Sequence, residues 1–227
     1  MANFIGSPQI ESSSELGTDE GEIRTMKSFL FLYVEDTIRE TLEEQTISTN
    51  CATANLRLAG PEDTETIARL VHQLAIYEKE PDAVNMTAQD YFMDGYNSAE
   101  PLFYCILADV VATDRDGDGE TEPTTTTTVA MGLFYFGHDL VNGPFLYLAD
   151  LFCDEAFRGK GIGTEIMKQL ASISLALDCS QFVWCALDWN APALSFYNKI
   201  GATIKQELKI TRYCGKDLQS FAQSQNK

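Results

Sequence analysis

Hydrophobic residues recur at every third or fourth position in several stretches, which indicates amphipathic helices. From Glu22 to about Gln45 the apolar stripe consists of Ile23, Met26, Leu30, Val34, Ile38 and Leu42. A second stripe begins at Pro61, a residue favoured in the first turn of a helix, and continues to about Glu78. We expect further helices over residues 88–95, from the glycines near 161 to about 178, and over 191–200.

Short apolar runs rich in β-branched and aromatic residues are typical of strands. Such runs begin at Asn55 and cover 102–112, 129–136, 145–153 and 181–187. We expect two more short strands within about 202–213. The hydrophilic, low-complexity segment 113–128 predicts a long loop between two strands. Because strands and helices alternate in the second half, the pattern predicts an α/β (α+β) fold with a mixed sheet.

Length and composition set the domain organisation. With 227 residues, 44% of them hydrophobic, the chain can form one sizeable core. We expect residues 1–21, acidic and rich in serine, to be a disordered tail and 22–50 to be a helical extension. The main domain is expected over 54–222. No apolar run approaches the roughly 18 residues that would span a bilayer, so we expect no membrane partner.

The formal net charge of −18 disfavours nucleic acid as a partner and would attract a small cationic substrate, although acidity also serves solubility. The six cysteines show no CxxC pairing, which favours reduced thiols and a cytoplasmic protein. Asp114, Asp116 and Asp118 match the opening of a calcium-binding loop, but the twelfth position is Thr125 instead of a bidentate glutamate. We therefore expect no metal.

A glycine-rich turn lies between an expected strand and an expected helix, in the string Arg158-Gly159-Lys160-Gly161-Ile162-Gly163. The first turn of a helix has unpaired N–H groups and a partial positive charge. Glycines let a phosphate approach these N–H groups closely, and two basic residues add charge beside them. The string predicts a pyrophosphate site, although a glycine-rich loop without a ligand is the alternative and no GxxxxGK[ST] phosphate loop is present.

A second motif follows the next expected strand and reads N-x-x-A-x-x-x-Y-x-x-x-G, from Asn190 to Gly201. Ala193 and Tyr197 are four residues apart and therefore share one face of the expected helix. A small residue one turn before an aromatic hydroxyl leaves room for a slender ligand beside that hydroxyl.

Together the two motifs resemble the GNAT superfamily of acetyl-coenzyme A-dependent N-acetyltransferases. The strings LVHQLAIYEKEPDAV and YFGHDLVNGPFLYLADLF are similar to its spermidine/spermine and thialysine branch. The resemblance covers roughly residues 55–218. It implies the GNAT fold, whose mixed, mostly antiparallel central sheet splays at the cofactor site and is flanked by helices. It also implies acetyl-CoA as cosubstrate and a homodimer.

The resemblance assigns cofactor-binding residues in three groups. The backbone of Leu151, Phe152 and Cys153 would meet the pantetheine arm, and Asn190 and Ala193 would line its thiol end. The pyrophosphate loop would consist of Arg158, Gly159, Lys160, Gly161, Ile162, Gly163 and Thr164. Tyr197 would line the same end of the cofactor and act as the general acid that protonates the coenzyme A sulfur.

On the acceptor side the resemblance implies contacts from Tyr77, Glu78, Asp139 and Asp150 to a diamine, a polyamine or a lysine-like amino acid. The sequence departs from the branch at Ala149, which replaces a glutamate of the branch's YLED string. The catalytic base would then be Asp150 or another carboxylate. Asp188-Trp189 matches the thialysine type better. Two alternatives stay open: acetylation of a protein lysine or N-terminus, and a non-catalytic module that senses acetyl-CoA.

Overall fold

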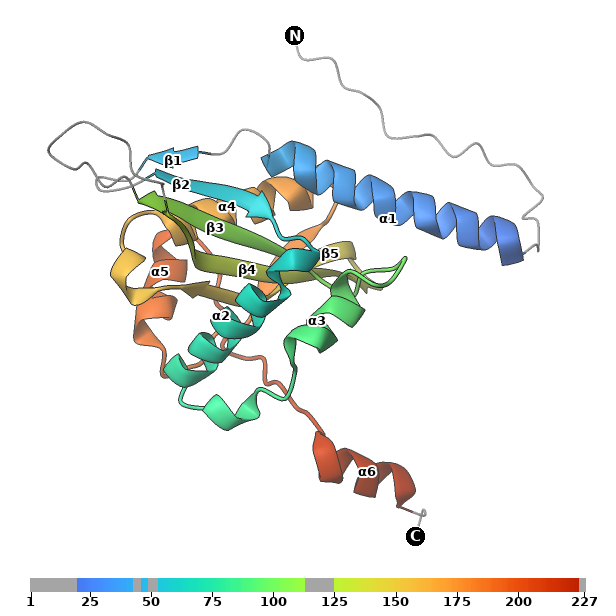
Figure 1. Ribbon diagram of the computed structural model, residues 1–227. Helices are drawn as coiled ribbons and strands as arrows, with labels where there is room; N and C mark the ends of the chain where they lie inside the picture. The colour runs from blue at the N-terminus through green and yellow to red at the C-terminus, as the bar shows by residue number, and fades with distance from the viewer. Residues whose placement is uncertain (1–19, 43–45, 49–52, 113–124, 225–227) are drawn as a thin grey trace, which may run out of the picture. The chain divides into compact units, whose positions relative to one another are not determined.

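The computed structural model describes residues 20–42, 46–48, 53–112 and 125–224 (Figure 1). The chain divides into two compact units, Met1–Cys185 and Ala186–Lys227, which are described separately. Most of the expected tail and of the segment with the calcium-like motif lies outside the described residues. None of the helices in the described ranges is long and apolar enough to span a membrane.

A six-stranded sheet forms the first unit, with its strands in chain order. The strands are β1 (Thr46–Ser48), β2 (Thr53–Leu58), β3 (Tyr104–Ala112), β4 (Thr125–Asp139), β5 (Gly143–Cys153) and β6 (Gln181–Trp184). Neighbours from β1 to β5 are antiparallel, and β5 and β6 are parallel. The expected mixed, mostly antiparallel sheet is confirmed. The loop expected over 113–128 was predicted too long at its C-terminal end, because β4 already begins at Thr125. The β-branched threonines at that end favour a strand.

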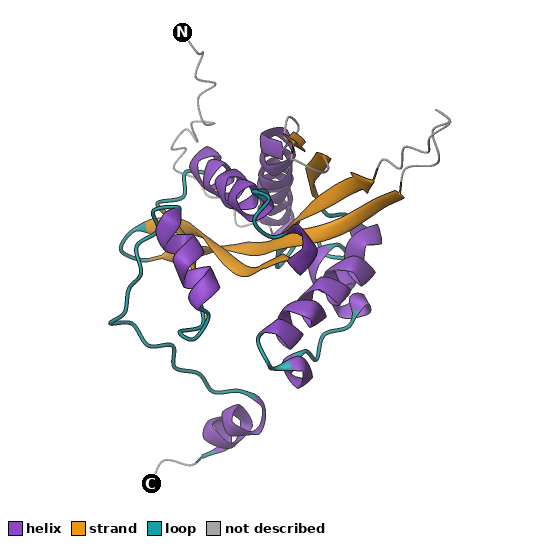
Figure 2. Cartoon of the chain, turned by 90° about the vertical axis from the view of Figure 1, so that its left-hand side faces the viewer, coloured by secondary structure: helices purple, strands orange, loops and turns teal. Residues whose placement is uncertain are grey.

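Helices cover both sides of this sheet (Figure 2). On one side α1 (Glu20–Leu42) packs against α4 (Ile162–Ala176) and β2, and on the other α2 (Thr64–Tyr77) packs against α3 (Ala88–Gly95). Three 3₁₀ turns complete the unit: η1 (Pro61–Asp63), η2 (Pro81–Ala83) and η3 (Glu155–Phe157). The N-terminal extension is therefore a helix that is followed by the edge strand β1.

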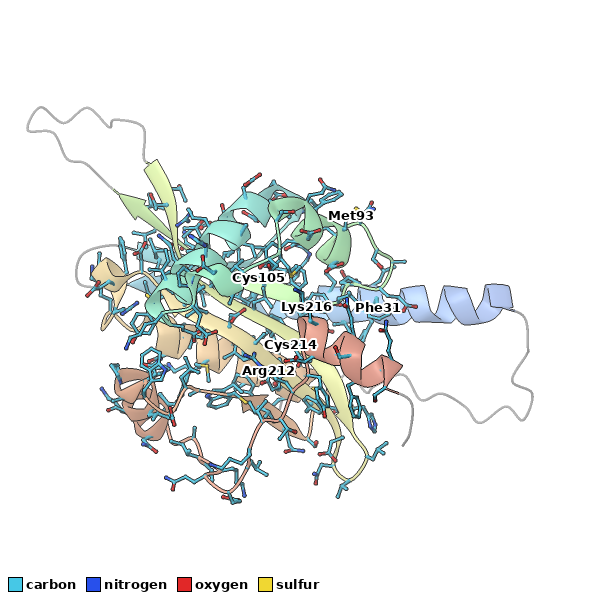
Figure 3. All side chains as sticks on the ribbon, turned by 90° about the horizontal axis from the view of Figure 1, so that it is seen from below. Phe31, Met93, Cys105, Arg212, Cys214 and Lys216 are labelled. Carbon is cyan, nitrogen blue, oxygen red and sulfur yellow. The ribbon has the colours of Figure 1, made fainter. Side chains whose placement is uncertain are left out.

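The apolar stripe of α2 forms the centre of one core, since Ile67, Leu70 and Leu74 are buried as its period predicts. These side chains pack against α3 and the facing strands. Cys105 of β3 belongs to the same cluster, beneath α2 and α3 (Figure 3). The space between α2, α3 and the facing strands is thus filled by a packed core.

A β-bulge in β5 changes which way its side chains point. Leu148 faces α4, beside Gly132, whereas Phe152 packs in the α2 core. Regular alternation would place residues four apart on the same face. The register between β4 and β5 shifts at this point and leaves Ala149 as the extra residue. The bulge reverses the facing, so Asp150 lies on the α2 side.

An ionic network joins β2 to the start of α2 and to β3. Arg57 donates to both carboxylate oxygens of Asp63, at 2.6 and 2.8 Å, and its Nε donates to Asp109 at 2.6 Å. Asp63 is buried and also accepts the N–H of Gly60. Burial raises the pKa of Asp63, but the bonds from Arg57 and Gly60 outweigh this, so the pKa is lowered overall.

We expect Asp63→Asn to lower the free energy of unfolding by about 1–3 kcal/mol, because it leaves the half-buried Arg57 guanidinium with only one of its two carboxylate partners, Asp109. Denaturant unfolding measures this change. Glu35→Gln is the matched control, since it removes the same charge from the exposed Glu35–Arg39 pair and should cost at most about 0.5 kcal/mol. Equal effects of the two substitutions would show that the network contributes no special stability.

The second unit contains α5 (Ala191–Lys199) and α6 (Gly215–Gln223). The prediction of two strands within 202–213 is wrong, because the described residues 186–224 form no strand. Ile204, Leu208 and Ile210 of this segment lie in exposed positions. A segment becomes a strand only when a neighbouring strand satisfies its backbone, and none of the described strands pairs with this one. Helix α6 was not predicted.

Candidate active site

A pocket of about 270 Å³ opens where the C-terminal half of α2, the following turn and β5 meet. Its lining residues are Val71, Leu74, Ala75, Glu78, Glu80, Ala83, Val84, Asn85, Met86, Tyr91 and Asp150. The wall is mostly apolar, and three carboxylates are set into it. No basic residue is among the lining. Such a pocket suits an alkyl chain that carries more than one positive charge.

The carboxylates of this pocket interact with one another. Burial raises the pKa of Glu78, and the negative charges of Asp150 and Glu80 raise it further. Burial also raises the pKa of Asp150. Burial disfavours the charged form of both carboxyls, and at Glu78 the like charges act in the same direction. A bound cation would relieve this repulsion, and a carboxylate whose pKa lies above its usual value is a better base near neutral pH.

The turn after α2 explains how so many pocket residues come from one short segment. Lys79 adopts a left-handed conformation with φ +66°, and the N–H of Glu80 returns to the carbonyl of Ala75 at 2.9 Å. This closure ends the helix and turns the chain, so that residues 83–86 also line the pocket. Helix α2 also points its negative end at the pocket, which favours cations.

The glycine-rich loop has the geometry expected of an anion site. Gly159 and Gly161 have φ of +74° and +92°, and open space lies where a Cβ atom would stand. Gly161 is the N-cap of α4 and offers no side chain to satisfy the first N–H groups of that helix. Gly163 and Thr164 belong to the first turn. Ile162 is buried, so only its backbone is available to a ligand.

The two basic residues of this loop rest on aromatic rings. The Arg158 guanidinium lies 4.7 Å from the centroid of the Tyr77 ring, and its Nε donates to the carbonyl of Cys153 at 2.9 Å. The Lys160 ammonium lies 4.6 Å from the Phe157 ring. Arg158 thus joins the end of β5 to the end of α2.

The sheet opens beside β5. Pairing between β5 and β6 stops at Leu148 and Trp184, whereas β5 continues to Cys153. The backbone of residues 149–153 is therefore not paired with β6. The Phe152 side chain packs in the core, so it could meet a cofactor only through its backbone. Near the opening the hydroxyl of Tyr147 donates to the Cys185 sulfur at 3.3 Å.

Comparison with known proteins agrees with this geometry. A family model described as "Acetyltransferase (GNAT) family" matches residues 77–202. Thialysine N-epsilon-acetyltransferase of Sus scrofa is 34% identical over 151 residues, which is 66% of this chain and 85% of that protein. The chain belongs to the GNAT acetyltransferase family.

Two further relatives of this GNAT chain are informative. The spermidine/spermine N(1)-acetyltransferase-like protein 1 of Homo sapiens is 33% identical over 147 residues, which is 65% of this chain and 20% of that protein. A solved aminoglycoside N-acetyltransferase, AAC(6')-Iy in complex with CoA, superposes with a TM-score of 0.54 at 15% identity. That match covers 71% of this chain and 95% of the other. It shows the shared fold.

The second motif of this GNAT chain spans α5, from its N-cap Asn190 to Gly201 just past its C-terminal end. The Asn190 side chain caps the helix by accepting the N–H of Ala193 at 3.2 Å. Tyr197 is buried, and Gly201 follows the helix in a left-handed conformation with φ +89°. The motif thus fixes a short helix that holds the tyrosine in place.

The residues expected to contact the acceptor do not all line the same pocket. Glu78 and Asp150 line one pocket, and Tyr77 is adjacent in sequence but lies beneath Arg158. Asp139 lies at the turn between β4 and β5, where it accepts the N–H groups of Val141 and Asn142, and it is not among the residues lining this pocket. These bonds lower its pKa.

Sequence reasoning missed the contributions of Glu80, Asn85, Met86 and Tyr91 to the pocket. The only signal for the first three was the Lys-Glu-Pro string after α2, which marks a chain reversal. Tyr91 carried the helical spacing of a core residue and gave no separate signal.

Proposed function

We propose that this GNAT chain transfers an acetyl group from acetyl-CoA to a primary amine of a small acceptor with more than one positive charge, or of a lysine-like acceptor. A diamine, a polyamine and a thialysine-type amino acid are the candidates. The observation that carries this proposal is the pocket with three carboxylates and no basic residue in its lining. The names of the relatives, thialysine and spermidine/spermine acetyltransferases, support the same acceptor class.

The residues present fit acetyl-CoA, which supplies the reactive thioester. Uncapped N–H groups at the start of α4, the two left-handed glycines and the basic residues Arg158 and Lys160 suit a pyrophosphate. The backbone of Leu151 and Cys153, beyond the end of β5–β6 pairing, would bind the pantetheine amides. Asn190 and Ala193 would lie along the thiol end.

The pocket carboxylates and Tyr197 would divide the proton transfers and the binding of the amine between them. An alkyl amine has a pKa near 10.4 and arrives protonated, so a base must remove one proton before attack. Asp150 would accept this proton on its carboxylate, directly or through water. Glu78 and Glu80 would bind the second ammonium group. Tyr197 would hold on its hydroxyl the proton that the departing thiolate requires.

An acceptor panel tests this proposal. Purified protein with acetyl-CoA is offered spermidine, putrescine, ornithine, lysine, thialysine and a lysine peptide, and the product is identified by mass. We expect a small amine with two positive charges to have a kcat/KM at least about tenfold above that of the peptide, because each well-placed carboxylate–ammonium pair contributes about 1.5 kcal/mol or more. Preference for the peptide would support protein acetylation instead. CoA binding without any turnover would support a sensor.

The resemblance also supports a homodimer. Light scattering of the full chain would give the mass of two copies if this part of the proposal is right.

A further inference from the structure

The contact between Arg158 and Tyr77 joins two sets of residues with different expected tasks. Arg158 belongs to the glycine-rich loop. Tyr77 is the last residue of α2, which forms one wall of the pocket with three carboxylates, the proposed amine pocket. The guanidinium lies 4.7 Å from the ring centroid, within the range of a cation–π contact. The sequence motifs gave no reason to expect the two side chains to meet.

Arg158 is held at two points and keeps donors to spare. Its Nε donates to the Cys153 carbonyl at 2.9 Å, and the ring of Tyr77 supports the planar group. Within the described part of the chain no other hydrogen bond and no ion pair involves this guanidinium. The two terminal nitrogens therefore remain able to donate to a phosphate in the bidentate manner that a guanidinium favours.

We propose that Tyr77 is a positioning residue for the phosphate-binding loop: with the Cys153 carbonyl, its ring orients Arg158 for a CoA phosphate. This assignment rests on the proposed use of acetyl-CoA. It differs from the contact with the amine acceptor that the family resemblance implies for Tyr77. A long side chain on an exposed loop loses much freedom when it binds a phosphate. A ring that already holds the guanidinium reduces that loss.

Isothermal titration with CoA itself tests this role without requiring turnover. We expect Tyr77→Leu to weaken CoA binding about two- to fivefold, the amount that an exposed cation–π contact corresponds to. Tyr77→Phe keeps the ring and should bind CoA like the wild type. Arg158→Ala removes the guanidinium, and with it the stack on Tyr77 and the Nε bond, so its affinity should also fall. The double variant should be no weaker than Arg158→Ala alone, because without the guanidinium the ring has nothing left to orient.

Two further probes locate the effect on the cofactor. Affinity for 3′-dephospho-CoA, which keeps the pyrophosphate, should fall with Tyr77→Leu as it does for CoA, whereas affinity for pantetheine should stay unchanged. The proposal is overturned if Tyr77→Leu binds CoA like the wild type, whether or not the KM for the amine changes, or if the losses from Tyr77→Leu and Arg158→Ala add. Wild-type protein that does not bind CoA would instead overturn the proposed function, and this inference with it.

Discussion

Asp150→Asn is expected to reduce turnover by about 10²–10⁴-fold while CoA affinity stays within about twofold. The substitution keeps the size of the side chain and removes the carboxylate that we propose as the base. Asp150 is the β5 carboxylate that the bulge turns toward the amine pocket, and Ala149 before it has no acidic group. Steady-state rates at saturating acetyl-CoA measure the loss, and calorimetry measures CoA affinity.

The dependence of the rate on pH tests the same assignment. Burial raises the pKa of Asp150, so the wild-type rate should rise with pH through a value above that of an ordinary aspartate. The neighbouring Glu78, whose pKa is raised by burial and then by Asp150 and Glu80, should contribute to the same limb through amine binding. In Asp150→Asn one of these charges is gone, so the pKa of Glu78 should fall and the remaining limb should move to lower pH.

Stability distinguishes loss of chemistry from loss of fold. A carboxyl whose pKa is raised on folding binds more protons in the folded than in the unfolded state, so its ionisation destabilises the fold as pH rises through that window. Asp150→Asn should therefore be at least as stable as the wild type at neutral pH. Asp82→Asn is the matched control, because Asp82 lies in η2 near the pocket but outside its lining. If both variants turn over like the wild type, Asp150 is not the base.

The bulge in β5 shows where sequence reasoning reached its limit. The string Tyr147-Leu148-Ala149-Asp150 revealed the missing glutamate and the neighbouring aspartate. It could not reveal that Leu148 and Phe152 face opposite sides, because alternation predicts the same side. The position of the extra residue is set by how β5 pairs with β4. This pairing is a contact between two strands and cannot be read from the string of β5 alone. The direction of Asp150 therefore needed the structure.

Local sequence patterns predicted helices whose apolar stripe is buried. They were less reliable for strands, whose formation depends on pairing with another strand. The stripe of α2 predicted that helix closely, and the glycine string predicted the start of α4. The strands expected within 202–213 did not form, since a strand needs a neighbour to pair with and the sequence does not specify one. The pocket wall formed by Glu80 and Met86 required the left-handed turn at Lys79, a conformation that lysine rarely adopts.

Tyr197→Phe is expected to reduce turnover by tens of fold or more and to leave CoA affinity unchanged, following the usual contribution of about 10²–10⁴ from a general acid. The substitution removes a single hydroxyl from a buried ring on α5. Tyr213→Phe is the matched control, because Tyr213 lies in the same unit, is exposed and stacks on Phe221. Unchanged turnover in Tyr197→Phe would mean that the ring only packs.

The two variants should also differ in their pH profiles, because Asp150 is proposed to accept a proton and Tyr197 to donate one. Loss of the donor should leave the acidic limb of the wild-type profile in place, since the pocket carboxylates still titrate. Loss of the acceptor should shift that limb. If Tyr197→Phe moves the acidic limb as Asp150→Asn does, the two residues do not act at separate proton transfers, and the assignment of roles fails even though both would matter for the rate.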